Sequence, residues 1–598
     1  MLKKSNIFAL LIIIIPLLLI GASNYFFAAS SYRFIIDPIT EEKAGRYWSG
    51  DIDGVIMALT MCLFVTAAWI PAAKFGWIDK LCEHITNRFK YYKIYVRENR
   101  RKLLIHIGIL ILILVAAFAV DFIYSFFSPR GLGNAVRRTA FFMTIGLSGY
   151  FMYIFRGKPE KLFFSISTAI GLLYVITHPM LFFGLDNEMH WAWAVEESYI
   201  LNVSVVQSDL TLARTFQTGY FGWLPSGEDN AVVYSFPKGA DTLTWVGNTS
   251  LRSLYYRISH IPMGLVIYFG RSLVLSPNII LWMVMFGSHL LYTTVVYFAI
   301  KRLNSGKYLM AAIALAPLTF LVSTTVGYDH WLKAFLLLGF AYYFHEIQTP
   351  DEKIKLKNIV IMIGAFVIGL SPKAIYFPVM LVLYFIRKSK FNSSKEYKIY
   401  LAAVTGLVLF VVASFMIPYF TTGGTGYEDI RAGENISASG QVRFILQNPL
   451  TYAGILLNFL KDYLNMFSNE RFITWYISYG HSSFPNFTMF FIMFIALTDR
   501  SEKDRFSSTI SNKIKMIIIL FATVALYTTS MYIAFSEVGA SVINGIQKRY
   551  LIPLLFPFFY AVLSFNIENK INKTAYSSCV FGFMAFILLY GAWNTFLP

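Results

Sequence analysis

The residues best able to do chemistry in this chain are ionisable groups at the ends of long apolar runs. An alternating membrane topology based on the positions of the basic loops places all of these groups on one face of a membrane. Carboxylates that face basic residues at one depth suit an enzyme acting on a lipid-linked phosphate. The groups form four clusters: Asp186-Asn187-Glu188-Met189-His190, Tyr328-Asp329-His330, Ser371-Pro372-Lys373 and Lys548-Arg549-Tyr550.

The first cluster supplies candidates for a general base. Asp186 and Glu188 directly follow an apolar run, and His190 lies two residues further on. Near the hydrocarbon boundary a carboxylate loses part of its hydration, which raises its pKa towards the range in which it can accept a proton. The alternative is that these side chains only end a helix at the level of the lipid headgroups.

Asp329 is the third candidate for a catalytic carboxylate, because a tight external turn would place it beside the first cluster. Lys333 follows four residues later. On a helix the two side chains share a face, so they could simply neutralise each other. A functional role for Lys333 is the competing interpretation.

The last two clusters supply cations for an anionic ligand. Lys373 follows the helix breaker Pro372 and has no acidic neighbour in the sequence, and Lys548 and Arg549 precede another apolar run. A guanidinium group binds phosphate with two parallel hydrogen bonds. The alternative is that these side chains reach out to lipid phosphates. Polar ring residues in the clusters are predicted to bind substrate: His190, Tyr328, His330 and Tyr550.

The composition requires a membrane protein. Of 598 residues, 57% are hydrophobic and only 14% are charged. The net charge of +18 does not indicate nucleic acid, because the basic residues concentrate in short loops between apolar runs. The stretch 74–102 alone holds nine lysine and arginine residues. These loops are therefore predicted to be cytoplasmic.

The fold class predicted is an all-α integral membrane protein with about fifteen transmembrane helices, each of ~20 apolar residues. The predicted spans are 7–27, 54–73, 103–127, 138–155, 162–184, 278–300, 308–326, 329–346, 358–370, 374–387, 399–420, 482–498, 516–535, 550–566 and 576–595. The pair 358–370 and 374–387 is short and could instead form one re-entrant unit. The first run is predicted to be a retained anchor, because it lacks a cleavage site of small residues.

Two long external segments are predicted, about 185–277 and about 421–481. In each of them apolar residues at helical spacing predict a helix lying in the membrane interface, at 260–275 and at 441–463. Residues 1–156 are predicted to form an N-terminal extension of four helices, and residues 157–598 a membrane core. The second external segment is a candidate lid, because it opens with the glycine-rich stretch 421–426.

Several classes of site are not indicated. The three cysteines show no paired spacing, and the chain has no Walker loop, dinucleotide fingerprint or metalloprotease motif. No cofactor is required by the sequence. A divalent metal ion held by Asp186 and Asp329 is left open.

From about residue 162 to the C-terminus the chain resembles the C-class glycosyltransferase superfamily (GT-C), whose members use polyprenyl-phosphate sugars. An acidic motif directly after an outward span carries the likeness, together with the phrase 260–277 before the next span and about eleven core helices. Within that superfamily it resembles a bacterial membrane family known as a domain of unknown function. The motifs that carry this closer likeness are Asp186–His190, Val326–Asp329, Leu370–Tyr376 and Lys548–Leu554.

Two positions depart from the pattern: Asn187 separates the two acids, and Lys548 stands where glycine more often precedes the arginine. The resemblance implies a glycosyltransferase of the bacterial plasma membrane with its active site on the extracytoplasmic face. It would move a sugar from a polyprenyl-phosphate donor to a cell-surface glycan or another extracytoplasmic acceptor. In this reading Lys373, Lys548 and Arg549 bind the donor phosphate. The alternative is a flippase of lipid-linked oligosaccharides or a polysaccharide polymerase.

Overall fold

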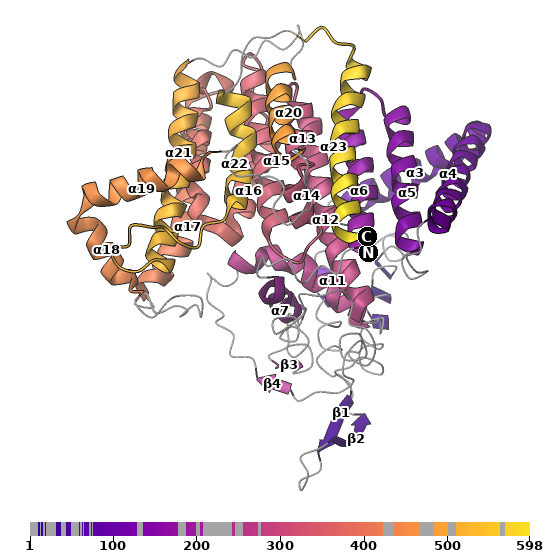
Figure 1. Cartoon of the computed structure of the whole chain (residues 1–598), viewed down its shortest axis with the longest axis horizontal. Helices are drawn as coiled ribbons and strands as arrows, with labels where there is room; N and C mark the ends of the chain where they lie inside the picture. Colours follow the sequence, from indigo (N-terminus) through magenta and orange to yellow (C-terminus); the bar gives the residue numbers. More distant parts are fainter. Residues whose placement is uncertain are drawn as a thin grey trace. The chain divides into compact units, whose positions relative to one another are not determined.

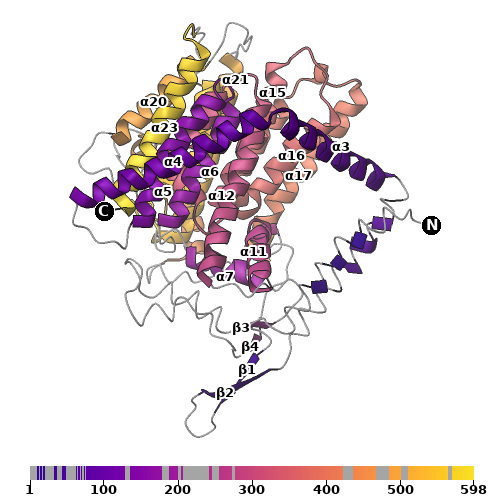
Figure 2. The same ribbon diagram turned by 90° about the vertical axis from the view of Figure 1, so that its right-hand side faces the viewer.

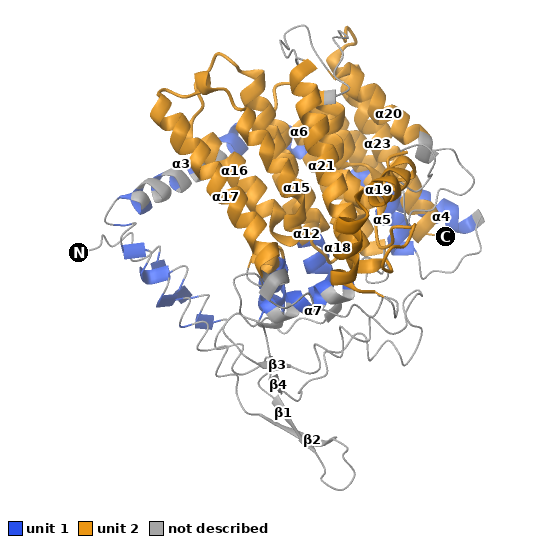
Figure 3. Cartoon of the chain, turned by 90° about the vertical axis from the view of Figure 1, so that its left-hand side faces the viewer, with its two compact units in different colours: residues 1–143, 179–247, 260–287 blue, residues 144–178, 248–259, 288–598 orange. Residues whose placement is uncertain are grey.

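The computed structural model describes residues 76–127, 135–177, 187–198, 255–272, 277–421, 436–465, 484–499, 510–562 and 569–597. It also describes four short strands, whose bounds are given below, and isolated helical positions between residues 10 and 73. These residues are predominantly helical (Figure 1). The strands, which the sequence did not predict, form two small antiparallel sheets: β1 (Tyr32–Ile36) with β2 (Lys43–Trp48), and β3 (Ser204–Val206) with β4 (Thr242–Thr244). The chain divides into two compact units (Figure 3), and each is described by itself.

Unit 1 comprises residues 1–143, 179–247 and 260–287. Its described helices are α3 (Trp77–Glu98), α4 (Arg100–Phe127), α7 (Asn187–Glu197), α11 (Ile261–Ser272), the first part of α5 (Ala135–Ile154) and the first part of α12 (Pro277–Arg302). Asp121 of α4 lies inside a predicted span, but its carboxylate accepts a hydrogen bond from Arg138 Nε at 2.7 Å. This acid is therefore paired within the unit.

Unit 2 comprises residues 144–178, 248–259 and 288–598. Its helices include α6 (Pro159–Thr177), the rest of α12, α13 (Lys307–Ala314), α14 (Pro317–Ser323), α15 (Asp329–Gln348), α16 (Leu356–Leu370), α17 (Ser394–Thr421), α20 (Phe484–Thr498), α21 (Ile510–Phe535), α22 (Ile552–Pro557) and α23 (Lys573–Phe596). Helices α18 (Ala438–Gln447) and α19 (Pro449–Tyr463) lie against α21 (Figure 1). The list of described elements is completed by the short helices η4 (Ile258–His260), η5 (Ser371–Phe385), η6 (Lys388–Lys390), η7 (Lys548–Leu551) and η8 (Phe558–Val562).

Seven helical segments in the described residues are long and apolar enough to cross a membrane. The sequence predicted about fifteen spans. Part of the difference has a physical source, because two predicted spans are broken into shorter helices. The span at 308–326 consists of α13 and α14 with a break before Pro317, and the span at 550–566 consists of α22 and η8. The exact number of crossings stays a prediction, since the predicted spans 7–27 and 54–73 lie largely outside the described residues.

The segment from α16 to η5 is a hairpin. The backbone N–H of Ile354 donates to the carbonyl of Lys390 at 2.8 Å, which brings the two ends of the segment together. The turn falls at Lys373, whose backbone (φ −146°, ψ 62°) interrupts the helix directly after Pro372. The structure thus agrees with the prediction of two short arms, 358–370 and 374–387. Lys373 lies at the tip, at the opposite end from Lys390.

Helix α15 runs antiparallel to α16, as the hydrogen bond from Trp331 Nε1 to the carbonyl of Ile368 shows (2.8 Å; Figure 2 shows α15 and α16 side by side). Asp329 therefore lies at the same end as the Lys373 tip. Residues of several basic loops of unit 2 that were predicted to share one face lie at the other end of these helices. There Arg302 pairs with Glu346, Lys353 donates to the carbonyl of Ser389, and Lys515 lies over the Phe385 ring.

The interior of unit 2 holds a polar contact that fixes the distance between α6 and α12. His289 Nε2 donates to the carbonyl of Ser167 at 2.8 Å, and its Nδ1 lies 2.8 Å from Ser323 Oγ. Gly171 faces the His289 ring, and a Cβ atom at this position would overlap the ring. Hydrogen bonds and small residues of this kind hold helices together in a membrane, where the hydrophobic effect between helices is weak.

We expect Gly171→Ala to lower the free energy of unfolding by about 1–3 kcal/mol, because the added methyl group must displace the His289 ring. Gly364→Ala in α16 is the matched control, since a Cβ there meets nothing within 4 Å. The control should be neutral or slightly stabilising, as alanine favours a helix more than glycine does. Thermal unfolding of the purified variants in detergent measures both, and equal midpoints would contradict the packing argument.

Candidate functional site

The predicted site residues fall in both units. Asp186 lies outside the described residues, and Glu188 is described only as a helical position of α7 in unit 1. His190 lies in the same helix. Tyr328, Asp329, His330, Lys373, Lys548, Arg549 and Tyr550 all lie in unit 2. The catalytic roles of the two acids at 186 and 188 stay predictions.

In unit 1, His190 belongs to a buried pair of histidines. His190 Nδ1 lies 3.0 Å from His260 Nε2, and the edge of the Trp193 ring system lies against both imidazoles. Helix α11 approaches α7 closely here because Gly264 lets its backbone lie against Ala194 and Glu197. The sequence predicted the helix that His260 precedes, but it did not predict that this histidine is the partner of His190.

In unit 2, Asp329 and Arg549 form a buried ion pair. Arg549 Nη1 donates to Asp329 Oδ2 at 2.8 Å, across 220 residues of sequence. Burial lowers the pKa of Arg549, but the Asp329 carboxylate, Tyr550 and Tyr328 together raise it by more, so the pKa lies above its ordinary value and the guanidinium stays charged. Asp329 is the first residue of α15, where the positive end of the helix dipole also favours a negative charge.

Lys373 lies within a cage of tyrosine rings. Its Nζ is 3.2 Å from the ring centre of Tyr550, 5.6 Å from that of Tyr328 and 6.0 Å from that of Tyr376. Aromatic faces attract a cation, so the three rings help to hold the ammonium. The cage is fixed in turn by the hydrogen bond from Tyr376 Oη to the carbonyl of Tyr550 at 2.8 Å.

The ring of Tyr550 joins the ion pair and the cage into one group. Lys373 Nζ lies over this ring, and the Arg549 guanidinium carbon lies 5.5 Å from its centre. We call this group the ionic cluster and define it by its members: Tyr328, Asp329, Lys373, Tyr376, Arg549 and Tyr550. His330, the next residue after Asp329, is fully buried in α15.

Lys548 does not point into the ionic cluster. Its Nζ donates to the carbonyls of Asp462 at 3.1 Å and of Tyr463 at 2.6 Å, at the C-terminal end of α19. Partial burial lowers the pKa of Lys548, and Asp462 opposes this shift. A cation at this position stabilises the C-terminus of a helix by binding its free carbonyls.

Sequence reasoning predicted two of the site's aromatic residues, Tyr328 and Tyr550, and missed the others. Tyr376 lies inside the motif that carries the family resemblance but was not singled out, and a cation three residues before an aromatic residue was the available signal. Tyr463 and Tyr527 form a second layer of contacts next to the cluster. Tyr463 Oη donates to the carbonyl of Gln547, Tyr527 Oη donates to Tyr463 Oη, and the Tyr527 ring stacks on Tyr376. Nothing in the sequence connects these rings to Lys373.

The described residues include no group of three or more His, Cys, Asp or Glu side chains that could hold a metal ion. The carboxylate of Asp329, one of the two groups for which a metal was left open, is engaged by Arg549. An arginine and a lysine fixed in a largely dehydrated environment are suited to anion recognition.

These features define a multi-pass helical membrane protein with a buried ionic cluster at one end of its core helices. The chain belongs to the DUF2142 family of predicted membrane proteins, whose model matches residues 168–557, well over half of the sequence. The predicted resemblance to a bacterial membrane family of unknown function agrees with this membership. Comparison with curated proteins and with solved structures found no match.

Proposed function

We propose that this protein is a membrane glycosyltransferase that moves a sugar from a polyprenyl-phosphate donor to a cell-surface glycan or another extracytoplasmic acceptor. The observation that supports it best is the ionic cluster, where Lys373 and Arg549 both lie at one tyrosine ring, that of Tyr550. A lipid phosphate can reach such a site from the bilayer while its polyprenyl tail stays among the helices. The GT-C relationship and the bacterial plasma membrane are part of this proposal.

In this mechanism Lys373 and Arg549 bind the donor phosphate and stabilise the negative charge that develops on it as the glycosidic bond breaks. Asp186 or Glu188 accepts the proton of the acceptor hydroxyl while the sugar passes through an oxocarbenium-like state. Asp329 orients Arg549 through the ion pair. Lys548 has no phosphate-binding role in this scheme, because its ammonium holds the end of α19.

The test replaces Asp186 with Asn and Lys373 with Ala, and measures sugar transfer by the purified chain from a panel of synthetic polyprenyl-phosphate sugars. We expect each variant to lose about 10²–10⁴-fold in turnover, the contribution of one positioned base, or of one charged group aimed at the developing charge. Lys357→Met is the control, since Lys357 is exposed at the start of α16. Unchanged transfer in both variants would refute the assigned roles. Movement of the lipid-linked sugar across the bilayer without a new glycosidic bond would favour the flippase.

A further inference from the structure

Two connecting segments of unit 2 form a basic surface at the end of the α16–η5 hairpin that lies away from the ionic cluster. The first, 351–355, precedes α16, and the second, 387–398, runs from the end of η5 into the first turns of α17. Their exposed acids are Asp351, Glu352 and Glu396, and their exposed cations exceed these acids by three. We call the exposed cations the basal surface: Lys353, Lys355, Arg387, Lys388, Lys395 and Lys398.

Hydrogen bonds hold the two segments together, so their cations belong to one surface. The backbone N–H of Ile354 donates to the carbonyl of Lys390 at 2.8 Å. Lys353 Nζ donates to the carbonyls of Ser389 and Phe391 at 2.8 and 2.9 Å. Lys390 itself is buried in an ion pair and does not belong to the basal surface. A surface whose backbone is fixed beforehand loses little conformational freedom when it binds a ligand.

The basal surface lies where two candidate membrane spans begin. The segments Leu356–Phe385 and Ser394–Ile417 are both long and apolar enough to cross a membrane. Their first turns expose apolar side chains directly beside the cations, with Leu356 75%, Val360 61% and Ile399 59% exposed. Cations next to exposed apolar side chains suit the boundary between the headgroups and the acyl chains of a bilayer.

We propose that the basal surface binds anionic phospholipids, whose phosphate groups contact the cations while their acyl chains cover the exposed apolar residues at the start of α16 and α17. The excess of positive charge favours an anionic headgroup over a zwitterionic one. The apolar residues favour a lipid over a soluble acidic partner, which would leave them uncovered. This site is separate from the ionic cluster and does not depend on the proposed glycosyl transfer.

A lipid at the basal surface would act on the hairpin that carries Lys373 at its tip. Lys355 enters the first arm of the hairpin, whereas Arg387 and Lys388 follow the second arm. One anionic headgroup between them would offset the repulsion among these like charges. An anionic lipid should therefore raise the thermal midpoint of the protein, because it binds the folded arrangement of the two arms. Added salt should weaken this effect, since it screens exposed charges.

The test is a lipid titration of the purified full chain in a mild detergent, with bound lipid counted by native mass spectrometry. Dioleoylphosphatidylglycerol is the anionic probe, and dioleoylphosphatidylcholine is the zwitterionic one. We expect the wild-type protein to bind the anionic lipid about tenfold more tightly, and the double variant Arg387→Gln with Lys388→Gln to lose most of this preference. Lys570→Gln with Lys573→Gln is the matched control, because both lysines are exposed beside the start of α23, and it should keep the preference.

A wild-type preference that survives in the double variant would overturn the proposal. Equal losses in the double variant and the matched control would overturn it too, since net charge rather than this surface would then decide binding. A second pair, Lys395→Gln with Lys398→Gln, tests the α17 side and should weaken binding of the anionic lipid by a similar factor. Wild-type binding of soluble polyglutamate without any preference between the lipids would indicate a protein partner instead. All these side chains are exposed, so the thermal midpoints without lipid should equal that of the wild type.

Discussion

Arg549→Met is expected to cost both stability and transfer. The substitution leaves the Asp329 carboxylate buried without its partner, and losing one half of a buried ion pair typically lowers the free energy of unfolding by about 3–5 kcal/mol. It also removes a group proposed to stabilise developing charge, so transfer should fall by about 10²–10³-fold. Thermal unfolding in detergent and the transfer assay measure the two effects separately.

Neighbouring variants separate the two effects. Arg549→Lys keeps the charge but loses the forked geometry, so its stability should fall less than that of Arg549→Met. The double variant Asp329→Asn with Arg549→Met removes both charges and should recover much of the stability without recovering transfer. Lys548→Met loses hydrogen bonds to two backbone carbonyls and a cation–π contact with the Tyr463 ring, and should cost about 1 kcal/mol. Full transfer by the double variant would show that Arg549 serves the fold alone.

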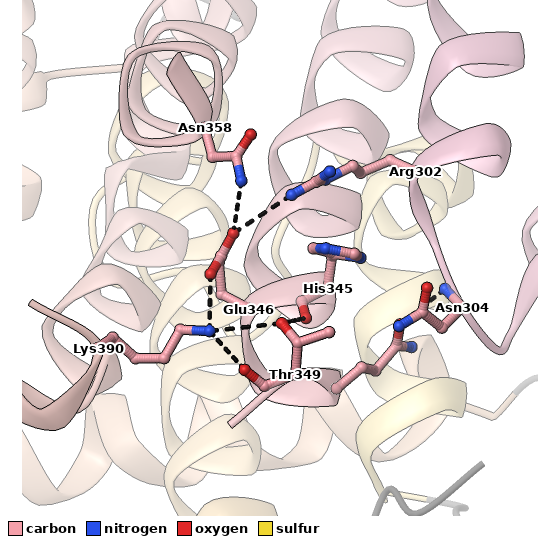
Figure 4. Close-up of polar contacts among 8 residues, drawn as sticks. Arg302, Asn304, His345, Glu346, Thr349, Asn358 and Lys390 are labelled. Atoms are coloured by element: carbon pink, nitrogen blue, oxygen red, sulfur yellow. Dashed lines mark hydrogen bonds and ion pairs between the residues drawn. The ribbon is translucent and has the colours of Figure 1, made fainter. Parts of the chain in front are cut away.

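Glu346→Ala is expected to have the largest effect at the other end of unit 2. The Glu346 carboxylate accepts from Lys390 Nζ at 2.9 Å, from Asn358 Nδ2 at 2.9 Å and from Arg302 Nη2 at 3.3 Å (Figure 4). It ties the ends of α12, α15 and α16 to η6. Its loss leaves the ammonium of Lys390 buried with only the oxygens of Thr349, so we expect the free energy of unfolding to fall by about 3–5 kcal/mol.

Glu352→Ala is the matched control, because Glu352 is an exposed acid in the loop after α15 and should change stability by less than about 0.5 kcal/mol. The double variant Glu346→Leu with Lys390→Met replaces the buried pair by apolar groups and should recover most of the loss. Thermal midpoints in detergent measure the series. A Glu346→Ala midpoint equal to that of Glu352→Ala would show that the contacts in Figure 4 contribute little to the fold.

The sequence was a good guide to helices whose apolar runs are uninterrupted. The predicted spans 103–127, 278–300 and 516–535 correspond closely to α4, α12 and α21. It was a poorer guide where a proline or a polar turn breaks a buried run, as at Pro317, because a broken helix in a protein interior and a complete crossing have the same composition. The predicted interfacial helix at 441–463 is two helices, interrupted at Asn448, directly before Pro449. Its place in the membrane interface, like that of α11, stays a prediction.

The site shows the same limit at the level of single side chains. Spacing along one helix suggested that Lys333 neutralises Asp329, whereas the carboxylate pairs with Arg549, 220 residues away. Periodicity reports neighbours on one element, and it carries no information about which distant element packs beside it. The four motifs could be chosen because unusual residue types interrupt apolar runs. Of the tyrosines that hold Lys373, Tyr328 and Tyr550 belong to the chosen clusters, whereas Tyr376 could not be singled out, because tyrosine is common throughout this chain.

Helix η7 joins two parts of unit 2 through consecutive residues. Lys548 donates a hydrogen bond to a carbonyl at the C-terminal end of α19, and Arg549 forms an ion pair with Asp329 at the start of α15. Their Cα atoms are about 3.8 Å apart, the fixed spacing across one trans peptide. Any shift of α19 that preserves its contacts with Lys548 must therefore also displace the guanidinium group of Arg549. A rearrangement of the chain on the far side of α19 would thus strain the ion pair between Arg549 and Asp329, even before a ligand binds.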